Sequence, residues 1–137
     1  MHDDDISTIL NDVKTIALVG ASDNPSRPSF GVMKYLLSQG YQVTPVSPKL
    51  AGTTLLGQKA YATLAEIPHP VDMVDVFRNA EAAFGVAQEA VDIGAKVLWL
   101  QLGVINLQAE ELATQVGLKV VMDRCPKIEI PRLGLEK

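Results

Sequence analysis

The sequence has a single cysteine, Cys125, among 137 residues, which excludes an internal disulfide framework and fits a reducing compartment. No apolar run approaches the ~20 residues that a membrane-spanning helix requires, and the opening residues MHDDDISTIL are acidic where a secretory signal is basic. Clustered positive charge, which attracts nucleic acids and anionic membranes, is also missing, because the net charge is −4. We therefore expect a cytoplasmic protein whose partners include neither nucleic acid nor a membrane; the sequence identifies no protein partner.

Groups that perform catalysis are also scarce. Nucleophilic catalysis needs a base within hydrogen-bond reach of a serine or cysteine, but His2 lies in the N-terminal segment and His69 lies between prolines in a loop. No group of His, Cys, Asp and Glu has metal-ligand spacing. Cys125 has two interpretations: the neighbouring Arg124 lowers its pKa and makes it a reactive thiol, or it is a small buried residue before a proline.

The apolar pattern alternates between strands and helices. Strand-like runs cover 16–19, 41–49, 71–77, 96–101 and 118–122, and helical periodicity covers 3–13, 30–40, 79–94 and 106–117, with a loop at 50–60. This alternation predicts a parallel sheet with right-handed crossovers. We expect an α/β fold in three layers, a Rossmann-like doubly wound five-stranded sheet in the order 3-2-1-4-5. It forms a single domain over residues 1–137, with a surface tail from about residue 128.

The strongest functional signal follows the first strand and reads GASDNPSRPSFG, residues 20–31. It joins a strand to a helix, which is where open α/β sheets bind ligands. The G-x-G-x-x-G pattern is absent, but the loop offers backbone N–H groups, the hydroxyls of Ser22, Ser26 and Ser29, and the guanidinium of Arg27. These donors suit a pyrophosphate. The alternative is an ordinary tight connection, because glycine and proline also mark turns.

The end of the second strand separates two classes of nucleotide ligand. An NAD site has Asp or Glu there, whereas this chain reads PVSPK at 45–49. Lys49 suits a phosphate on the ribose, as in NADP or in a ligand with a 3′-phosphate; a solvated lysine is the alternative. After the third strand, Arg78 either adds charge to the site or pairs with Asp75 or with a surface carboxylate. After the fourth, Gly103 allows a ligand to approach the backbone closely.

Seven stretches occur in a familiar order: VGAS (19–22), PSRPS (25–29), TPVSPK (44–49), LGQKAYATLAEIP (56–68), VDMVDVFRN (71–79), LWLQLGVIN (98–106) and DRCP (123–126). They resemble the stand-alone CoA-binding protein family, which is similar to the CoA-binding domain of the succinyl-CoA synthetase alpha subunit. The resemblance implies a Rossmann-like domain that binds CoA or an acyl-CoA. The phosphohistidine of the synthetase lies in a later domain that 137 residues do not accommodate, so the implied activity is binding without thioester synthesis.

The resemblance also implies a place for each candidate residue. The Ser22 to Ser29 loop lies at the CoA phosphates, Lys49 at the ribose 3′-phosphate, and the turn around Gln101 to Gly103 along the pantetheine arm. The residues expected to bind the ligand are Gly20, Ala21, Ser22, Ser26, Arg27, Pro28, Ser29, Lys49, Phe77, Arg78, Gln101, Leu102 and Gly103. A reactive Cys125 would form a mixed disulfide with the CoA thiol.

Two other functions stay open. One is an NADP-dependent oxidoreductase, although no Tyr-x-x-x-Lys pair follows the fourth strand. The other is an interaction module whose nucleotide site has been lost.

Overall fold

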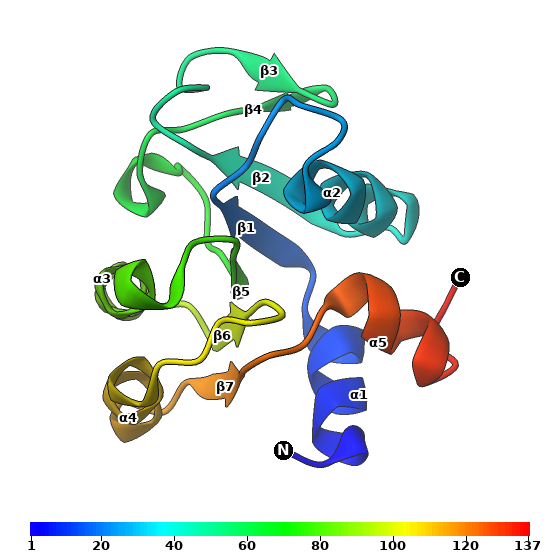
Figure 1. Cartoon of the computed structure of the whole chain (residues 1–137), viewed down its shortest axis with the longest axis vertical. Coiled ribbons are helices and arrows are strands. Elements are labelled where there is room, and N and C mark those ends of the chain that lie inside the picture. Colours follow the sequence, from blue (N-terminus) through cyan, green and yellow to red (C-terminus); the bar gives the residue numbers. More distant parts are fainter.

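The computed structural model describes all residues, 1–137, and shows a parallel sheet with helices on both faces (Figure 1). Its elements are α1 (Asp3–Asp12), β1 (Thr15–Val19), α2 (Pro28–Ser38), β2 (Gln42–Val46), β3 (Thr54–Leu55), β4 (Gln58–Lys59), the 3₁₀ turn η1 (Leu64–Glu66), β5 (Met73–Val76), α3 (Ala80–Asp92), β6 (Val97–Leu100), α4 (Leu107–Gln115), β7 (Lys119–Val121) and α5 (Pro126–Arg132). The predicted α/β class and doubly wound sheet are confirmed. None of the helices combines the length and apolar character needed to cross a membrane.

The strand order differs from the prediction. The sheet runs β2-β1-β5-β6-β7, which is 2-1-3-4-5 when the five strands are numbered along the chain, so the order 3-2-1-4-5 is wrong. β5 pairs with β1 on one side and β6 on the other, and all four of its residues are buried. A strand whose residues are buried on both faces lies in the middle of a parallel sheet, where helices cover both faces, and not at its edge.

The place beside β2 is taken by the segment around Tyr61. Tyr61 and Val46 form a single parallel bridge. The Tyr61 N–H donates to the Pro45 carbonyl at 3.1 Å, and the Ser47 N–H donates to the Tyr61 carbonyl at 2.9 Å. The third strand usual in doubly wound sheets is thus reduced to one bridge, and the short β3–β4 hairpin precedes it.

Two apolar layers hold the helices to the sheet. Side chains alternate along each strand, so that Ile16 and Leu18 of β1 face one layer while Ala17 and Val19 face the other. The first layer includes buried residues of α1, α2 and α5, and the second includes those of α3 and α4. Figure 1 shows this division, with α3 and α4 on the opposite side of the sheet from α1, α2 and α5.

The predicted surface tail is wrong for residues 128–132, which form part of α5. Ile130 is buried in the first layer, and the buried Glu129 pairs with Arg124 at 2.6 Å and Arg132 at 2.9 Å. Arg132 also pairs with Asp3 at 2.8 Å, which connects α5 to α1. A helix of seven residues has too few turns to give a clear period, and its stabilising ion pairs come partly from the other end of the chain.

Candidate functional site

A cleft of about 860 Å³ opens at the carboxyl ends of β1, β2 and β5. Its lining residues come from the ends of these strands, from the loops that follow them, from the first turn of α2, from the segment after β4 and from α3: Val19, Gly20, Ala21, Ser22, Arg27, Pro28, Ser29, Val46, Ser47, Pro48, Lys49, Ala62, Thr63, Phe77, Arg78, Val86 and Glu89. The chain leaves β1 for α2 on one face of the sheet and leaves the adjacent β5 for α3 on the other. The cleft therefore lies at the topological switch point, where ligands of open α/β sheets bind.

Gly20 shapes the floor of this cleft. Its φ is +89°, and a Cβ added there would lie 2.5 Å from the carbonyl oxygen of Phe77. Its N–H donates to the Val46 carbonyl at 3.0 Å. The chain after β1 thus passes tightly between the ends of β5 and β2, and a side chain at position 20 would obstruct it.

The loop between Gly20 and α2 is organised by Asn24. The Asn24 Oδ1 accepts from the Ser26 N–H at 3.0 Å and from the Ser26 hydroxyl at 2.8 Å, and the Asn24 N–H donates to the Ser22 hydroxyl at 3.1 Å. Ser26 is therefore engaged within the loop and does not line the cleft. Ser29, in the first turn of α2, does line it.

The first turn of α2 contributes donors to the cleft. Pro28 occupies the start of the helix, where the missing N–H costs nothing. The Phe30 N–H donates to the Arg27 carbonyl at 3.1 Å, whereas the Ser29 N–H has no partner in a preceding turn. The Ser29 N–H and the helix dipole favour an anion.

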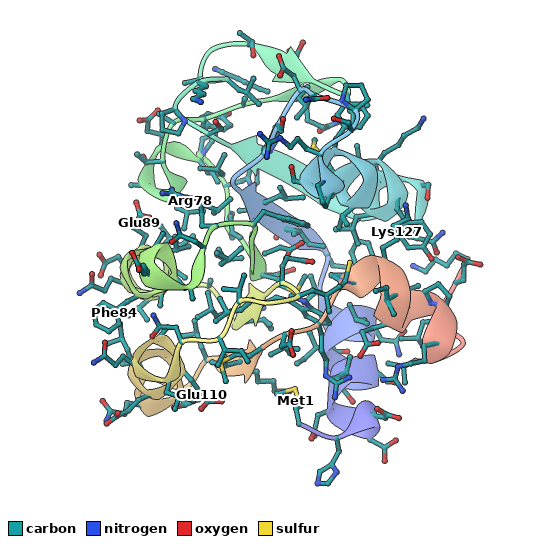
Figure 2. The ribbon with its side chains drawn as sticks, in the orientation of Figure 1. Met1, Arg78, Phe84, Glu89, Glu110 and Lys127 are labelled. Atoms are coloured by element: carbon teal, nitrogen blue, oxygen red, sulfur yellow. The ribbon has the colours of Figure 1, made fainter.

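Three cations from three different elements meet at the cleft: Arg27 before α2, Lys49 after β2 and Arg78 after β5. None of them forms an ion pair within 4.0 Å, since the four ion pairs of the chain involve other cations. Glu89 is the one carboxylate of the lining, and Figure 2 shows it near Arg78 on the α3 side. Three cations against one carboxylate, in a protein of net charge −4, give the cleft an excess of positive charge, which favours anions.

Part of the lining was not predicted from the sequence. Ala62 and Thr63 reach the cleft because the bridge at Tyr61 holds their segment against β2, and such pairing across a long loop has no local signal. Val86 and Glu89 are spaced i, i+3 on α3, so they share one side of that helix. This spacing, in the helix that follows Arg78, was the one signal in the sequence that Val86 and Glu89 could lie together on the cleft.

The predicted residues Gln101, Leu102 and Gly103 lie beside the cleft and do not line it. They form a turn after β6, closed by a hydrogen bond of 2.9 Å from the Val104 N–H to the Gln101 carbonyl. The Gln101 N–H donates to the Val76 carbonyl at 3.3 Å, which places the turn next to Phe77.

Asp75 lies beneath this turn, fully buried on β5. Its Oδ1 accepts from the Gln101 side-chain amide at 2.6 Å, whereas its Oδ2 has no hydrogen-bond partner. Burial raises the pKa of Asp75 to about 7, and the bond from Gln101 offsets only part of that effect. Asp75 is thus unavailable to Arg78, which was one of the two predicted roles for that arginine.

Cys125 lies at the start of α5, buried in the first apolar layer and outside the cleft. Burial raises the pKa of its thiol, and backbone hydrogen bonds from Lys127 and Ile128 oppose the rise without reversing it. Arg124, the cation expected to lower this pKa, instead donates to Glu129 at 2.6 Å. The arrangement matches the interpretation of a small buried residue.

Comparisons with known proteins complete the description of the site. Residues 14–131 match the family described as CoA binding domain. The chain is 41% identical over 124 residues to uncharacterized protein YneT of Bacillus subtilis, covering 90% of each chain. It is 33% identical over 122 residues to ADP-forming acetate–CoA ligase I subunit alpha of Pyrococcus furiosus, covering 79% of this chain but only 26% of the ligase subunit. The solved structure of a hypothetical protein from Pyrococcus horikoshii OT3 superposes with a TM-score of 0.92 at 41% identity, covering 97% and 92% of the two chains.

Proposed function

The chain belongs to the CoA-binding domain family, as its motifs predict, and from that premise we propose that it binds CoA or an acyl-CoA in the cleft, as one domain and without catalysis of its own. The observation that carries the proposal is the meeting of Arg27, Lys49 and Arg78 at the switch point, where none of them has an anionic partner. CoA supplies two groups that suit them, a pyrophosphate and a ribose 3′-phosphate.

The pyrophosphate is assigned to the start of α2. Gly20, Ala21, Ser22, Arg27 and Ser29 all border the cleft, and they offer backbone N–H groups, two hydroxyls and a guanidinium to it. Gly20 adds no side chain that would keep a phosphate from the backbone N–H groups.

The ribose 3′-phosphate is assigned to Lys49. Doubly wound sheets hold the ribose beyond the end of β2, and Lys49 follows that strand on the cleft wall. The absence of a carboxylate there disfavours NAD, since the ribose hydroxyls of NAD are usually bound by Asp or Glu at that point. The pantetheine arm then leaves the phosphates toward the turn of Gln101 to Gly103.

The proposal of binding without catalysis is supported by the chemistry of the lining. No histidine or cysteine borders the cleft, so Ser22 and Ser29 have no imidazole to act as a base. The chain also spans about a quarter of the ligase subunit that it resembles, and the reaction of that subunit is not assigned to it.

Thermal denaturation with CoA, acetyl-CoA, NAD and NADP in parallel tests the proposal. A ligand present at 100 times its Kd stabilises the folded state by about 2.7 kcal/mol, which raises Tm on the order of 10 °C for a chain of this size. We expect this shift with CoA or acetyl-CoA. A shift with NADP alone would contradict the proposal and favour an oxidoreductase, and no shift with any ligand would favour an interaction module.

A further inference from the structure

The turn beside the cleft is fixed by two aspartates from the neighbouring strands. Asp75, on β5, accepts from the Gln101 side-chain amide at 2.6 Å. Asp123, after β7, accepts from the Gly103 backbone N–H at 2.7 Å through its Oδ1. The segment after β6 is therefore held at both ends by carboxylates from the strands that flank β6.

Asp123 adopts a backbone conformation that few non-glycine residues take. Its φ is +58°, one of two positive values outside glycine in the chain. Such a conformation costs of order 1 kcal/mol or more and persists where the surroundings hold it in place. The hydrogen bond from Gly103 is the one that the Asp123 side chain makes, so the strained position serves to hold that turn.

The turn itself has a defined shape. The Val104 N–H donates to the Gln101 carbonyl, and Gly103 has a φ of +77°, which matches the third position of a type II turn. Leu102, at the second position, is 57% exposed. The turn thus presents the apolar side chain of Leu102 to solvent at the carboxyl edge of the sheet, where its exposure is unfavourable in the absence of a ligand.

The turn lies on the path open to a long ligand. Phe77 and Arg78, which follow β5, border the cleft, and the Gln101 N–H donates to the carbonyl of Val76, the residue before Phe77. On the opposite side, the segment around Tyr61 closes the edge next to β2. A ligand whose phosphates occupy the start of α2 and whose ribose points toward Lys49 extends its remaining arm across β5 to β6.

We propose that Asp75 and Asp123 are positioning residues that clamp the turn of Gln101 to Gly103, so that Leu102 and the turn backbone contact the arm of bound CoA. This inference rests on the proposed function, because it concerns the part of the same ligand that lies beyond the phosphates. Holding the turn in advance removes the cost of ordering it on binding.

The test compares CoA with adenosine 3′-phosphate 5′-diphosphate, which has the nucleotide and its phosphates but no arm. Asp123→Gly removes the carboxylate and tolerates the positive φ, while Asp123→Asn keeps an acceptor oxygen for Gly103 and is the conservative control. We expect Asp123→Gly to weaken CoA binding about tenfold, since an unclamped turn must be ordered. Binding of the armless nucleotide stays unchanged, and Asp123→Asn restores most of the CoA affinity.

Leu102→Ser provides a second variant, and Leu107→Ser is its matched control, because Leu107 is also exposed, at 68%, on the adjacent α4. Leu102→Ser weakens CoA binding about fivefold through lost apolar contact and leaves the armless nucleotide unaffected, whereas Leu107→Ser changes neither. If Asp123→Gly and Leu102→Ser lost equal affinity for CoA and for the armless nucleotide, or lost no affinity for CoA, the inference would be overturned.

Failure of the clamp can be separated from failure of the proposed function. In the ligand-free protein, amide exchange of Gly103 is faster in Asp123→Gly than in Asp123→Asn if the hydrogen bond fixes the turn. If the unaltered protein binds neither CoA nor the armless nucleotide, the proposed function fails and the ligand-contacting role of the turn fails with it. If it binds both and the variants bind both equally well, only the clamp is refuted.

Discussion

Asp75 gives the sharpest test of the energetics of the fold. Burial raises its pKa from an ordinary value of 3.8 to about 7, so the folded protein holds a proton that the unfolded chain has already released. As pH rises from 5 to 8, the folded state must give up that proton, and the free energy of unfolding falls. Each unit of pKa difference corresponds to about 1.4 kcal/mol, so the loss between pH 5 and pH 8 amounts to about 3 kcal/mol.

Other carboxyl groups do not produce this slope. The pKa values of Asp3, Asp72 and Glu129 are lowered by their partners. The stability contributed by these ionised groups is present above their unfolded pKa values and is lost only as the pH falls well below 5. Between pH 5 and pH 8 the decrease is therefore assigned to Asp75.

Asp75→Asn removes the titration and keeps the geometry. The amide oxygen of asparagine is able to accept from Gln101 as Oδ1 does, and the amide nitrogen occupies the place of Oδ2, which has no partner. We expect the variant to lack the slope, so that its stability relative to the unaltered protein increases by about 3 kcal/mol between pH 5 and pH 8.

Urea denaturation of both proteins at pH 5, 6, 7 and 8 measures the difference directly. Subtracting one profile from the other removes the contribution of groups that both proteins share. Parallel profiles would show that Asp75 stays ionised in the folded protein and would refute the reasoning.

Three further predictions follow from the cleft and its surroundings. Gly20→Ala lowers the free energy of unfolding by about 3 kcal/mol, because of the positive φ and the clash with the Phe77 carbonyl. Gly40→Ala lowers it less, because Gly40 has a φ of +92° but no atom within 4 Å of an added Cβ. Equal losses of stability for the two variants in urea denaturation would show that the clash does not matter. Glu89→Gln tightens CoA binding about threefold in calorimetry, because it removes the negative charge of the lining; weaker binding would show that Glu89 accepts a hydrogen bond from the ligand. Incubation with oxidised CoA leaves the mass of the native protein unchanged, since the Cys125 thiol is buried with a raised pKa; a CoA adduct would identify a reactive thiol.

The fold class and the place of several candidate residues on the cleft could be predicted from the sequence, because they are encoded in adjacent residues. The alternation of apolar runs indicates the α/β class, and the stretch from Gly20 to Ser29 combines a glycine, hydroxyls and a cation before a helix. Lys49 and Arg78 each follow a strand directly, so the common direction of parallel strands brings them to one edge. Of the ligand-binding residues predicted in this stretch, all except Ser26 border the cleft, and so do Lys49 and Arg78.

The features that were missed depend on contacts between distant segments. Strand order depends on which strand is buried on both faces. β5 is buried on both faces although it contains an aspartate, Asp75, which is itself fully buried. Thr63 reaches the cleft through one bridge at Tyr61. The strained Asp123 is recognised as a clamp only once Gly103, twenty residues earlier, is seen to donate to it.

Calorimetric titration of the unaltered protein with CoA and with dephospho-CoA, repeated on Lys49→Ala and on Lys34→Ala, tests the central claim most directly. Lys34 is an exposed lysine of α2 that does not border the cleft, so its variant is the matched control. We predict that the unaltered protein and Lys34→Ala prefer CoA over dephospho-CoA by about tenfold, as expected for one charge-assisted contact to the 3′-phosphate, and that Lys49→Ala binds the two ligands equally. Absence of CoA binding by the unaltered protein, or an unchanged preference in Lys49→Ala, would contradict the assignment of this cleft to CoA.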